Sequence, residues 1–341
     1  MLKNEMLSFT SSGIYCEPAD VFIDPWKPVD RALITHGHAD HSRWGHKKYL
    51  STRTAAPVIR HRLGNINLAT VEFGEKINLH GVDISFYPAG HIVGSAQIRL
   101  EYKGEVWVVS GDYKLERDRI TEAYEPVKCH TFITESTFGL PIYKWKDQSE
   151  VFESINAWWK SNQELGKTTV LTGYALGKAQ RIIQNLNESI GTIYTHGAIE
   201  NVNEVIRNQG FPLKPTVRVT PELGKSDFEG NIVIATPSAV GSSWVKKFGS
   251  ISIGSASGWM NLRGARRRRG VDRGFVLSDH ADWDGLNKAV DESQAERVFV
   301  THGYTNIFAK WLNEKGLEAA VVETQFEGEL TEIGEGTTKE E

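Results

Sequence analysis

Residues of the types that bind metal ions are concentrated in one short segment of the chain. The segment is His36-Gly37-His38-Ala39-Asp40-His41, three imidazoles and one carboxylate within six residues. It directly follows the apolar run 31–35, which predicts a strand. A strand-to-loop turn can direct alternate side chains into one site, and neutral imidazole and carboxylate are the usual ligands of hydrolytic zinc or manganese. The sequence therefore predicts a metal-binding loop here.

Three further polar residues follow predicted strands. They stand in Pro88-Ala89-Gly90-His91, in Val109-Ser110-Gly111-Asp112 and in Val300-Thr301-His302-Gly303. A lone histidine after a strand is usually a packed or capping residue. Three such positions beside the first loop are better explained as further ligands, because strand ends of one sheet layer gather at one edge. A carboxylate such as that of Asp112 can bridge two ions, so we expect a two-metal centre.

Composition narrows the class of protein. Of the 341 residues, 40% are hydrophobic and 24% are charged, the balance of a globular enzyme. The net charge of −4 excludes a global basic field, so any polyanion site must be a local patch. The only cysteines, Cys16 and Cys129, fit a reducing compartment as buried thiols. With no secretory or membrane-spanning apolar run, we expect a cytoplasmic protein without a membrane partner.

The pattern of predicted strands and helices changes twice along the chain. Residues 1 to about 140 contain short apolar strands such as 82–86 and 105–109. From about 145 to 260, strand and helix alternate, with helices expected over 148–165 and from Leu176 to Ile190, where Gly191 ends the second one. From about 270 to 330 a strand at 297–301 and a helix at 307–315 follow. These alternations predict an α/β fold, with a partly parallel sheet in the middle region.

The ligand set resembles that of the metallo-β-lactamase superfamily, including a first aspartate at Asp24 in Phe22-Ile23-Asp24. The resemblance implies an αββα sandwich. It also implies that one metal is bound by His36, His38, His91 and Asp112, and the other by Asp40, His41, Asp112 and His302. In that family the first aspartate orients the histidine loop, so Asp24 is expected to support the ligands and not to bind metal.

Further segments resemble the β-CASP nucleases of this superfamily. They are Thr134-Glu135-Ser136-Thr137, Leu277-Ser278-Asp279-His280 and the cap segments Tyr174-Ala175-Leu176-Gly177-Lys178 and Ser255-Ala256-Ser257-Gly258-Trp259. The resemblance implies an inserted α/β cap domain at 145–262, between metallo-β-lactamase parts at 1–144 and 263–330. The polar, glycine-rich composition of the end of the chain predicts a disordered tail at 331–341. Glu135 alone would be an ordinary turn acid. Beside the metal motifs we expect it to orient His280 and favour its charged form.

The implied chemistry is phosphodiester hydrolysis. A hydroxide held between two divalent ions (zinc or manganese) attacks phosphorus in line. Asp40, Glu135 and His280 are the expected catalytic residues, with His280 protonating the leaving oxygen or gripping the phosphate. An arginine run is usually a solvated surface, but this one lies just before His280, and arginine binds phosphate bidentately. The expected nucleic-acid contacts are Arg263, Arg266, Arg267, Arg268, Arg269 and Lys178.

The kind of nucleic acid is less constrained than the chemistry. Whole-chain resemblance is to the bacterial ligase-associated DNA exonucleases, which implies DNA end processing in repair beside an ATP-dependent DNA ligase and a helicase. His302 favours the alternative, because RNA-processing β-CASP members carry that histidine and the eukaryotic cross-link repair nucleases typically lack it. Phosphate contacts carry no sugar identity. A small-molecule hydrolase such as a lactonase, and a metal-free nucleic-acid-binding scaffold, are the remaining alternatives.

Overall fold

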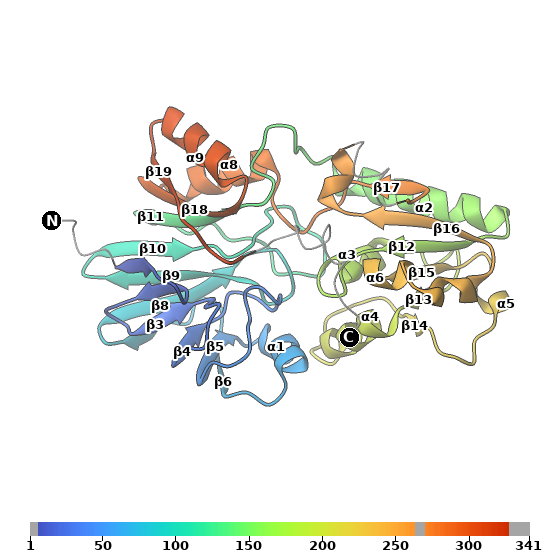
Figure 1. Cartoon of the computed structure of the whole chain (residues 1–341), viewed down its shortest axis with the longest axis horizontal. Helices are drawn as coiled ribbons and strands as arrows, with labels where there is room; N and C mark the ends of the chain where they lie inside the picture. Colours follow the sequence, from blue (N-terminus) through green and yellow to red (C-terminus); the bar gives the residue numbers. More distant parts are fainter. Residues whose placement is uncertain (1–5, 263–269, 327–341) are drawn as a thin grey trace. The chain divides into compact units, whose positions relative to one another are not determined.

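The computed structural model describes residues 6–262 and 270–326 of the chain. This part of the chain forms two compact units (Figure 1). The first, called the sandwich unit, comprises residues 6–117, 121–142 and 280–326. The second, called the parallel-sheet unit, comprises residues 118–120, 143–262 and 270–279.

The described residues of the sandwich unit form two sheets. One has six strands in the order β1 to β6: β1 (Leu7–Phe9), β2 (Ile14–Cys16), β3 (Val21–Ile23), β4 (Arg31–Leu33), β5 (Lys48–Thr52) and β6 (Leu68–Val71). The other has the order β19-β18-β11-β10-β9-β8-β7. Its strands are β7 (Ile77–Leu79), β8 (Val82–Pro88), β9 (Ala96–Tyr102), β10 (Glu105–Val109), β11 (Thr131–Ser136), β18 (Arg297–Gly303) and β19 (Glu318–Val321).

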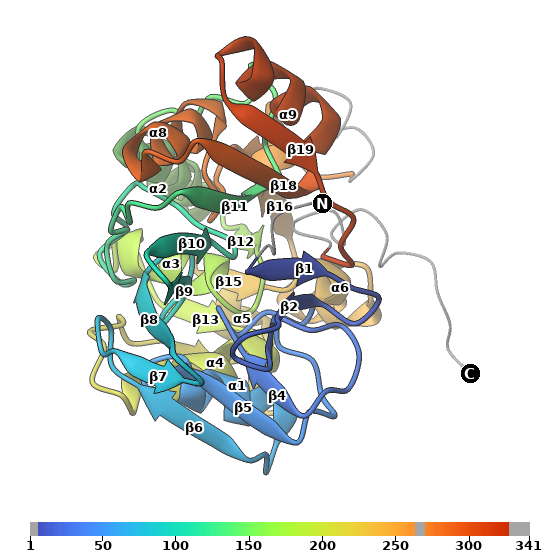
Figure 2. The same ribbon diagram turned by 90° about the vertical axis from the view of Figure 1, so that its left-hand side faces the viewer.

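Successive side chains of a strand point to opposite faces of the sheet, and this divides the core of the unit into layers. On β10, Trp107 and Val109 face the core shared with β1 to β4, whereas Val106 and Val108 face helices α8 (Trp283–Ser293) and α9 (Thr305–Glu314). On the first sheet, Ala32 packs toward α1 (Ala56–Leu63). The layers are therefore helix, sheet, sheet, helix, with α8 and α9 outside the seven-stranded sheet (Figure 2).

Strand direction brings distant parts of the chain to one edge of the seven-stranded sheet. β10 pairs in parallel with β11, and β11 pairs in parallel with β18. β9 is antiparallel to both β8 and β10, so β8 also runs in the direction of β10. The carboxyl ends of β8, β10, β11 and β18 therefore emerge at the same edge, and His91, Asp112, Glu135 and His302 lie at or just after these ends.

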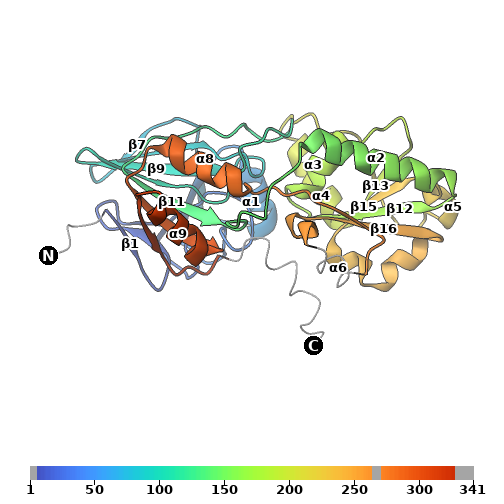
Figure 3. The same ribbon diagram turned by 90° about the horizontal axis from the view of Figure 1, so that it is seen from above.

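The parallel-sheet unit has six strands in its described residues, in the order β14-β13-β15-β12-β16-β17, and every pair is parallel. They are β12 (Thr168–Thr172), β13 (Ile193–Thr195), β14 (Val217–Arg218), β15 (Ile232–Ala235), β16 (Ile251–Ala256) and β17 (Arg273–Phe275). The helical segments are α2 (Gln148–Glu164), α3 (Lys178–Asn185), α4 (Gly197–Arg207), α5 (Lys225–Phe228), α6 (Pro237–Val240), η1 (Ser243–Phe248) and η2 (Gly258–Asn261) (Figure 3).

Most predicted elements are present, with one clear error. The helix expected over 148–165 is α2, and its Trp158 and Trp159 are buried as expected of core residues. The helix expected from Leu176 to Ile190 is wrong at its end, because α3 stops at Asn185. Leu186 is extended, with φ −70° and ψ 147°, and the side chain of Asn187 accepts from the backbone N–H of Ser189 to form a turn. Apolar residues continue at helical spacing beyond Asn185, but the turn at Asn187 ends the helix.

Within the described ranges, no helix has the length and apolar character needed to cross a membrane.

The loop after the histidine-rich segment is held by a buried histidine. The Nδ1 atom of His46 accepts from the backbone N–H of Val29 at 3.3 Å, so the ring must be neutral to keep this bond. The hydroxyl of Tyr49 accepts from the backbone N–H of His46 and donates to the carbonyl of Arg43. Burial lowers the pKa of His46 to about 4.

The His46 ring should make the protein less stable in mild acid. Between pH 6.5 and about pH 4 the unfolded chain binds a proton at this position that the folded chain excludes. The free energy of unfolding should therefore fall as the pH falls through this window. A His46→Gln variant should show a shallower fall, measured by urea unfolding at pH 7 and pH 5. His61→Gln, at an exposed position of α1, is the matched control, and parallel curves for His46→Gln and the wild type would contradict the prediction.

Candidate metal centre

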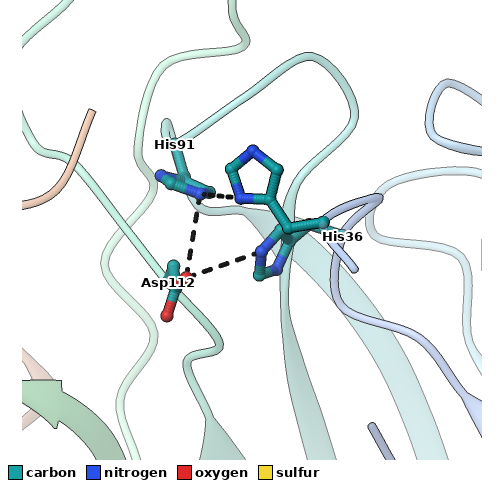
Figure 4. Close-up of side chains that lie close together, drawn as sticks. His36, His91 and Asp112 are labelled. Carbon is teal, nitrogen blue, oxygen red and sulfur yellow. Dashed lines mark hydrogen bonds and ion pairs between the residues drawn. The ribbon is translucent and has the colours of Figure 1, made fainter. Parts of the chain in front are cut away.

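A cluster of buried side chains lies at the edge where the four strands end. Its first group brings together His36, His38, His91 and Asp112, with one potential ligand atom of each within 4.8 Å of all the others. The Nε2 atoms of His36 and His91 lie 3.5 and 3.8 Å from Oδ2 of Asp112. Nδ1 of His38 lies 3.0 Å from Nε2 of His91. Figure 4 shows His36 and His91 directed toward the Asp112 carboxylate.

A second group shares the same carboxylate. It consists of His41, Asp112 and His302. Nε2 of His41 lies 3.5 Å from Oδ2 of Asp112, and Nε2 of His302 lies 3.1 Å from Oδ1. An oxygen of Asp40 lies 3.7 Å from Nε2 of His41. All seven side chains expected as ligands thus converge, and Asp112 stands between the two groups.

The donor atoms fit metal ions. The Nε2 atoms of His36 and His41 are buried and make no hydrogen bond to any residue in the described part of the chain. A buried polar atom without a partner is costly, and a metal ion would satisfy it. Ligands about 2.1 Å from a tetrahedral zinc ion stand about 3.4 Å from one another. The 3.1 to 3.8 Å separations around Asp112 are close to that spacing.

The charge of the cluster is set by its burial and by its acids. Burial holds the pKa of His36 well below its usual value, so this ring is neutral. Burial also acts to lower the pKa of His41, but the carboxylates of Asp112, Asp40 and Asp24 outweigh it and raise the pKa to about 10. Burial acts to raise the pKa of Asp112, and the surrounding histidines, His41 first among them, nevertheless hold it well below its usual value. The carboxylate is therefore ionised.

Asp24 supports the histidine loop from outside the cluster. Its Oδ2 faces Nδ1 of His41 at 2.8 Å, and its two oxygens accept from the backbone N–H and the hydroxyl of Thr35. Because that hydroxyl donates to Asp24, it can only accept from Nδ1 of His36, 3.0 Å away. Both histidines are thereby left with Nε2 as the atom facing Asp112, which is the arrangement that a ligand-supporting residue produces.

The same arrangement recurs at the other end of the chain. The hydroxyl of Thr301 donates to the carbonyl of Thr134 at 3.1 Å and lies 2.9 Å from Nδ1 of His302. Nδ1 of His302 therefore donates to the threonine, and Nε2 faces Asp112. Neither Thr35 nor Thr301 is among the site residues predicted from the sequence. The repeated Thr-His pair, Thr35-His36 and Thr301-His302, is the signal that could have revealed them.

Glu135 and His280 form a buried pair beside the cluster. Nδ1 of His280 lies 2.8 Å from Oε2 and 3.0 Å from Oε1 of Glu135. Oε1 also accepts from the backbone N–H of Tyr113, the residue after Asp112. Asp112, Glu135 and His280 offer a further set of potential ligand atoms within 4.8 Å of one another. The pair expected from the sequence is thus formed in the structure, and a backbone bond ties it to the segment that carries Asp112.

The expected nucleic-acid contacts are less well defined. Arg263 and Arg266 to Arg269 lie outside the described residues. Lys178 is fully buried, with its ammonium 3.4 Å from Oδ1 of Asp279 and 4.8 Å from the centre of the Tyr174 ring. Its environment is that of a buried ion pair, and not of a solvated lysine on a helix surface.

Glycines with positive φ adjoin three of the ligands. Gly90, Gly111 and Gly303 have φ of 73°, 56° and 87°. A Cβ added at Gly111 would lie 2.7 Å from the hydroxyl of Thr35, and one at Gly303 would lie 2.2 Å from the carbonyl oxygen of Ser136. These turns need glycine both for backbone conformation and for space.

Together, the helix-sheet-sheet-helix sandwich and the histidine-aspartate cluster at its edge have the arrangement of a metallo-β-lactamase fold with side chains that could bind metal. Comparison with other proteins identifies the branch. No model of a known protein family matches the chain. It is 31% identical over 91% of its length to a protein named "Probable DNA ligase" from Opitutus terrae, and this match spans 30% of that protein.

Two other relatives have names that refer to RNA. The chain is 22% identical over 85% of its length to "Endoribonuclease YSH1" of Mycosarcoma maydis, of which it spans 43%. It is 25% identical over 56% of its length to an "RNase J-like protein" of Methanocaldococcus jannaschii, of which it spans 53%.

A crystal structure of a protein of unknown function from Enterococcus faecalis shares the fold, with a TM-score of 0.59 at 11% identity, over 86% of this chain and 79% of that one.

The chain belongs to the metallo-β-lactamase superfamily, in its β-CASP branch. Its fold is accordingly the metallo-β-lactamase αββα sandwich with an inserted α/β domain. The chain spans between about a third and about half of the length of these three relatives.

Gly111→Ala should weaken metal binding. The added methyl would press on Thr35 and disturb the hydrogen bonds that orient His36. Loss of such supporting contacts typically weakens metal binding about 10- to 100-fold. Metal content per chain, measured by mass spectrometry after dialysis against a weak chelator, tests this expectation.

Gly104→Ala is the matched control for Gly111→Ala. Gly104 also has positive φ, 84°, but no atom of the described chain beyond its two sequence neighbours lies within 4 Å of a Cβ added there. Both variants should lose about 1 kcal/mol of stability from backbone strain. Only Gly111→Ala should lose metal, and equal metal contents in the two variants would contradict the prediction.

Proposed function

We propose that this protein is a two-metal phosphodiesterase that acts as a DNA exonuclease in the processing of DNA ends. The observation that carries the proposal is the convergence of six histidine and aspartate side chains on two groups that share Asp112, with Asp40 beside His41 and the Glu135–His280 pair next to them. We also propose that the sandwich unit is the metallo-β-lactamase domain and that the parallel-sheet unit is the β-CASP cap.

The ligand residues would hold two divalent ions, zinc or manganese. One ion would lie among His36, His38, His91 and Asp112, and the other among Asp40, His41, Asp112 and His302. Bound there, such ions supply an activated water and offset the negative charge of a phosphodiester. Asp24, Thr35 and Thr301 keep Nε2 of their histidines available by occupying Nδ1.

His280 would act on the leaving group. Glu135 occupies Nδ1 of His280, so Nε2 is the atom that can donate to a substrate oxygen. The ring of His280 lies with its centre 4.6 Å from that of His91, which places it next to the first ligand group. A histidine held in this way can protonate the departing oxygen or bind the scissile phosphate.

DNA as the substrate is supported by the relative from Opitutus terrae. A segment similar to nearly all of this chain makes up 30% of a protein named a probable DNA ligase. A nuclease segment joined to a ligase fits the trimming of ends before they are sealed. We therefore propose an ATP-dependent DNA ligase as a partner, and a helicase by family resemblance.

RNA is the second candidate substrate. Two relatives are named as an endoribonuclease and as similar to RNase J. His302 also favours RNA, because its presence in the second ligand group is a feature that the RNA-processing members share. Hydrolysis of a phosphodiester bond at this site would be possible for either DNA or RNA.

Cleavage of end-labelled DNA and RNA, single- and double-stranded, tests the function directly. With Mn²⁺ or Zn²⁺ we expect the protein to shorten DNA from an end, and Asp40→Ala to lower the rate by a factor of about 100 or more, on the order of a lost catalytic interaction. Undiminished cleavage by Asp40→Ala would exclude this site. Faster cleavage of RNA would favour the second candidate, and turnover of a lactone or thioester alone would exclude a nuclease. The ladder of products gives the direction of cleavage.

Glu135→Gln should separate the role of the Glu135–His280 pair from metal binding. The amide keeps the shape of the side chain but loses its charge, so His280 is oriented and stabilised less well. We expect kcat to fall about 100-fold, with little change in KM and with full metal content. Glu314→Gln, on the surface of α9, is the control. A loss of metal that accounts for the lost activity would instead make Glu135 a support of the ligands.

A further inference from the structure

An aromatic side chain from the segment after β19 lies against the second ligand group. The ring of Phe326 is stacked on the ring of His41, with centres 4.3 Å apart and planes inclined by 11°. Its edge meets the ring of His302, with centres 5.7 Å apart. Phe326 also packs edge-on against Trp26 and is 9% exposed. A single buried phenylalanine thus contacts both histidines of this group.

The segment that carries Phe326 is fastened to both ligand-bearing parts of the chain. The hydroxyl of Thr324 donates to the carbonyl of Thr301, the residue before His302, at 2.9 Å. The guanidinium of Arg43, two residues after His41, donates to the carbonyl of Gln325 at 2.9 Å. One bond therefore reaches the strand of His302 and the other reaches the loop of His41. The position of the ring is coupled in this way to the positions of both histidines.

The contacts constrain His41 in two directions. Asp24 holds Nδ1 in the plane of the imidazole, and Phe326 covers one face of it. Only Nε2 is left to face Asp112. An imidazole bound to a cation carries positive charge on its ring, and an aromatic face attracts such a ring. The phenyl ring also keeps water from this side of the two histidines, and water is what must enter when an ion leaves.

We propose that Phe326 is a positioning residue of the metal centre, and that it controls how long the ion at His41, Asp112 and His302 stays bound. The inference rests on the proposed function in one respect, which is that these groups hold metal ions. Among the described residues the rings that Phe326 contacts are those of Trp26, His41 and His302, so the ion at His36, His38, His91 and Asp112 should be unaffected. The two ions should therefore respond differently to a change at Phe326.

The loss of zinc to a coloured chelator measures this difference without any assay of activity. The full-length protein, loaded with two zinc ions, is mixed with excess chelator and the release is followed in time. In Phe326→Leu the ion at His41, Asp112 and His302 should leave roughly tenfold faster, because losing one aromatic contact corresponds to about a tenfold change. The other ion should leave at the wild-type rate. Phe326→Tyr should restore the slower release. The cobalt-substituted protein should show an altered visible spectrum in Phe326→Leu only.

Phe9→Leu is the matched control. Phe9 packs edge-on against Phe299 in the same unit and contacts neither histidine in the described structure. Thr324→Val is a second variant. It keeps the phenyl ring but removes one of the two hydrogen bonds that hold the segment of Phe326. It should increase the release rate of the same ion by a smaller factor.

The outcomes separate the inference from the function on which it rests. Release from Phe326→Leu and Thr324→Val at the wild-type rate, or equal acceleration by Phe9→Leu, would overturn the role of Phe326 while leaving the nuclease proposal standing. A wild-type protein that binds no zinc, manganese or cobalt would contradict the two-metal function itself, and the inference with it.

Discussion

The carboxylate of Asp112 is the point on which the site depends. It is buried and ionised, and it lies within 4 Å of ring nitrogens from His36, His41, His91 and His302. An isolated charge in such a place would be strongly unfavourable. It is tolerated because imidazoles surround it, and metal ions would stabilise it further. The same feature places one residue in contact with both ligand groups, as a dinuclear centre requires.

The sheet topology makes this convergence possible. Because β8, β10, β11 and β18 run in one direction, residues 91, 112, 135 and 302 emerge together although they stand far apart in the sequence. Glycines then allow the chain to turn where the strands end. Gly111 and Gly303 sit so close to Thr35 and Ser136 that a side chain at either position would displace the parts it meets.

The polar residues around the cluster act on the histidines through the far side of each ring. Asp24 and the hydroxyls of Thr35 and Thr301 occupy Nδ1, and this leaves Nε2 for a metal. Glu135 does the same for His280, whose other nitrogen would serve the substrate instead. The same kind of hydrogen bond therefore orients both the expected ligands and the proposed acid.

The sequence by itself determined the types of group available and most of the elements that carry them. A motif of closely spaced histidines and aspartates is visible locally, as is the period of helix α2, so the ligand loop and that helix could be predicted. The end of α3 could not, because a side-chain turn at Asn187 overrides a continuing apolar pattern. Only the tertiary structure decided which nitrogen of each histidine faces Asp112, that Thr35 and Thr301 set this choice, and that Phe326 covers His41. These are contacts between residues far apart in the chain, and no local pattern specifies them.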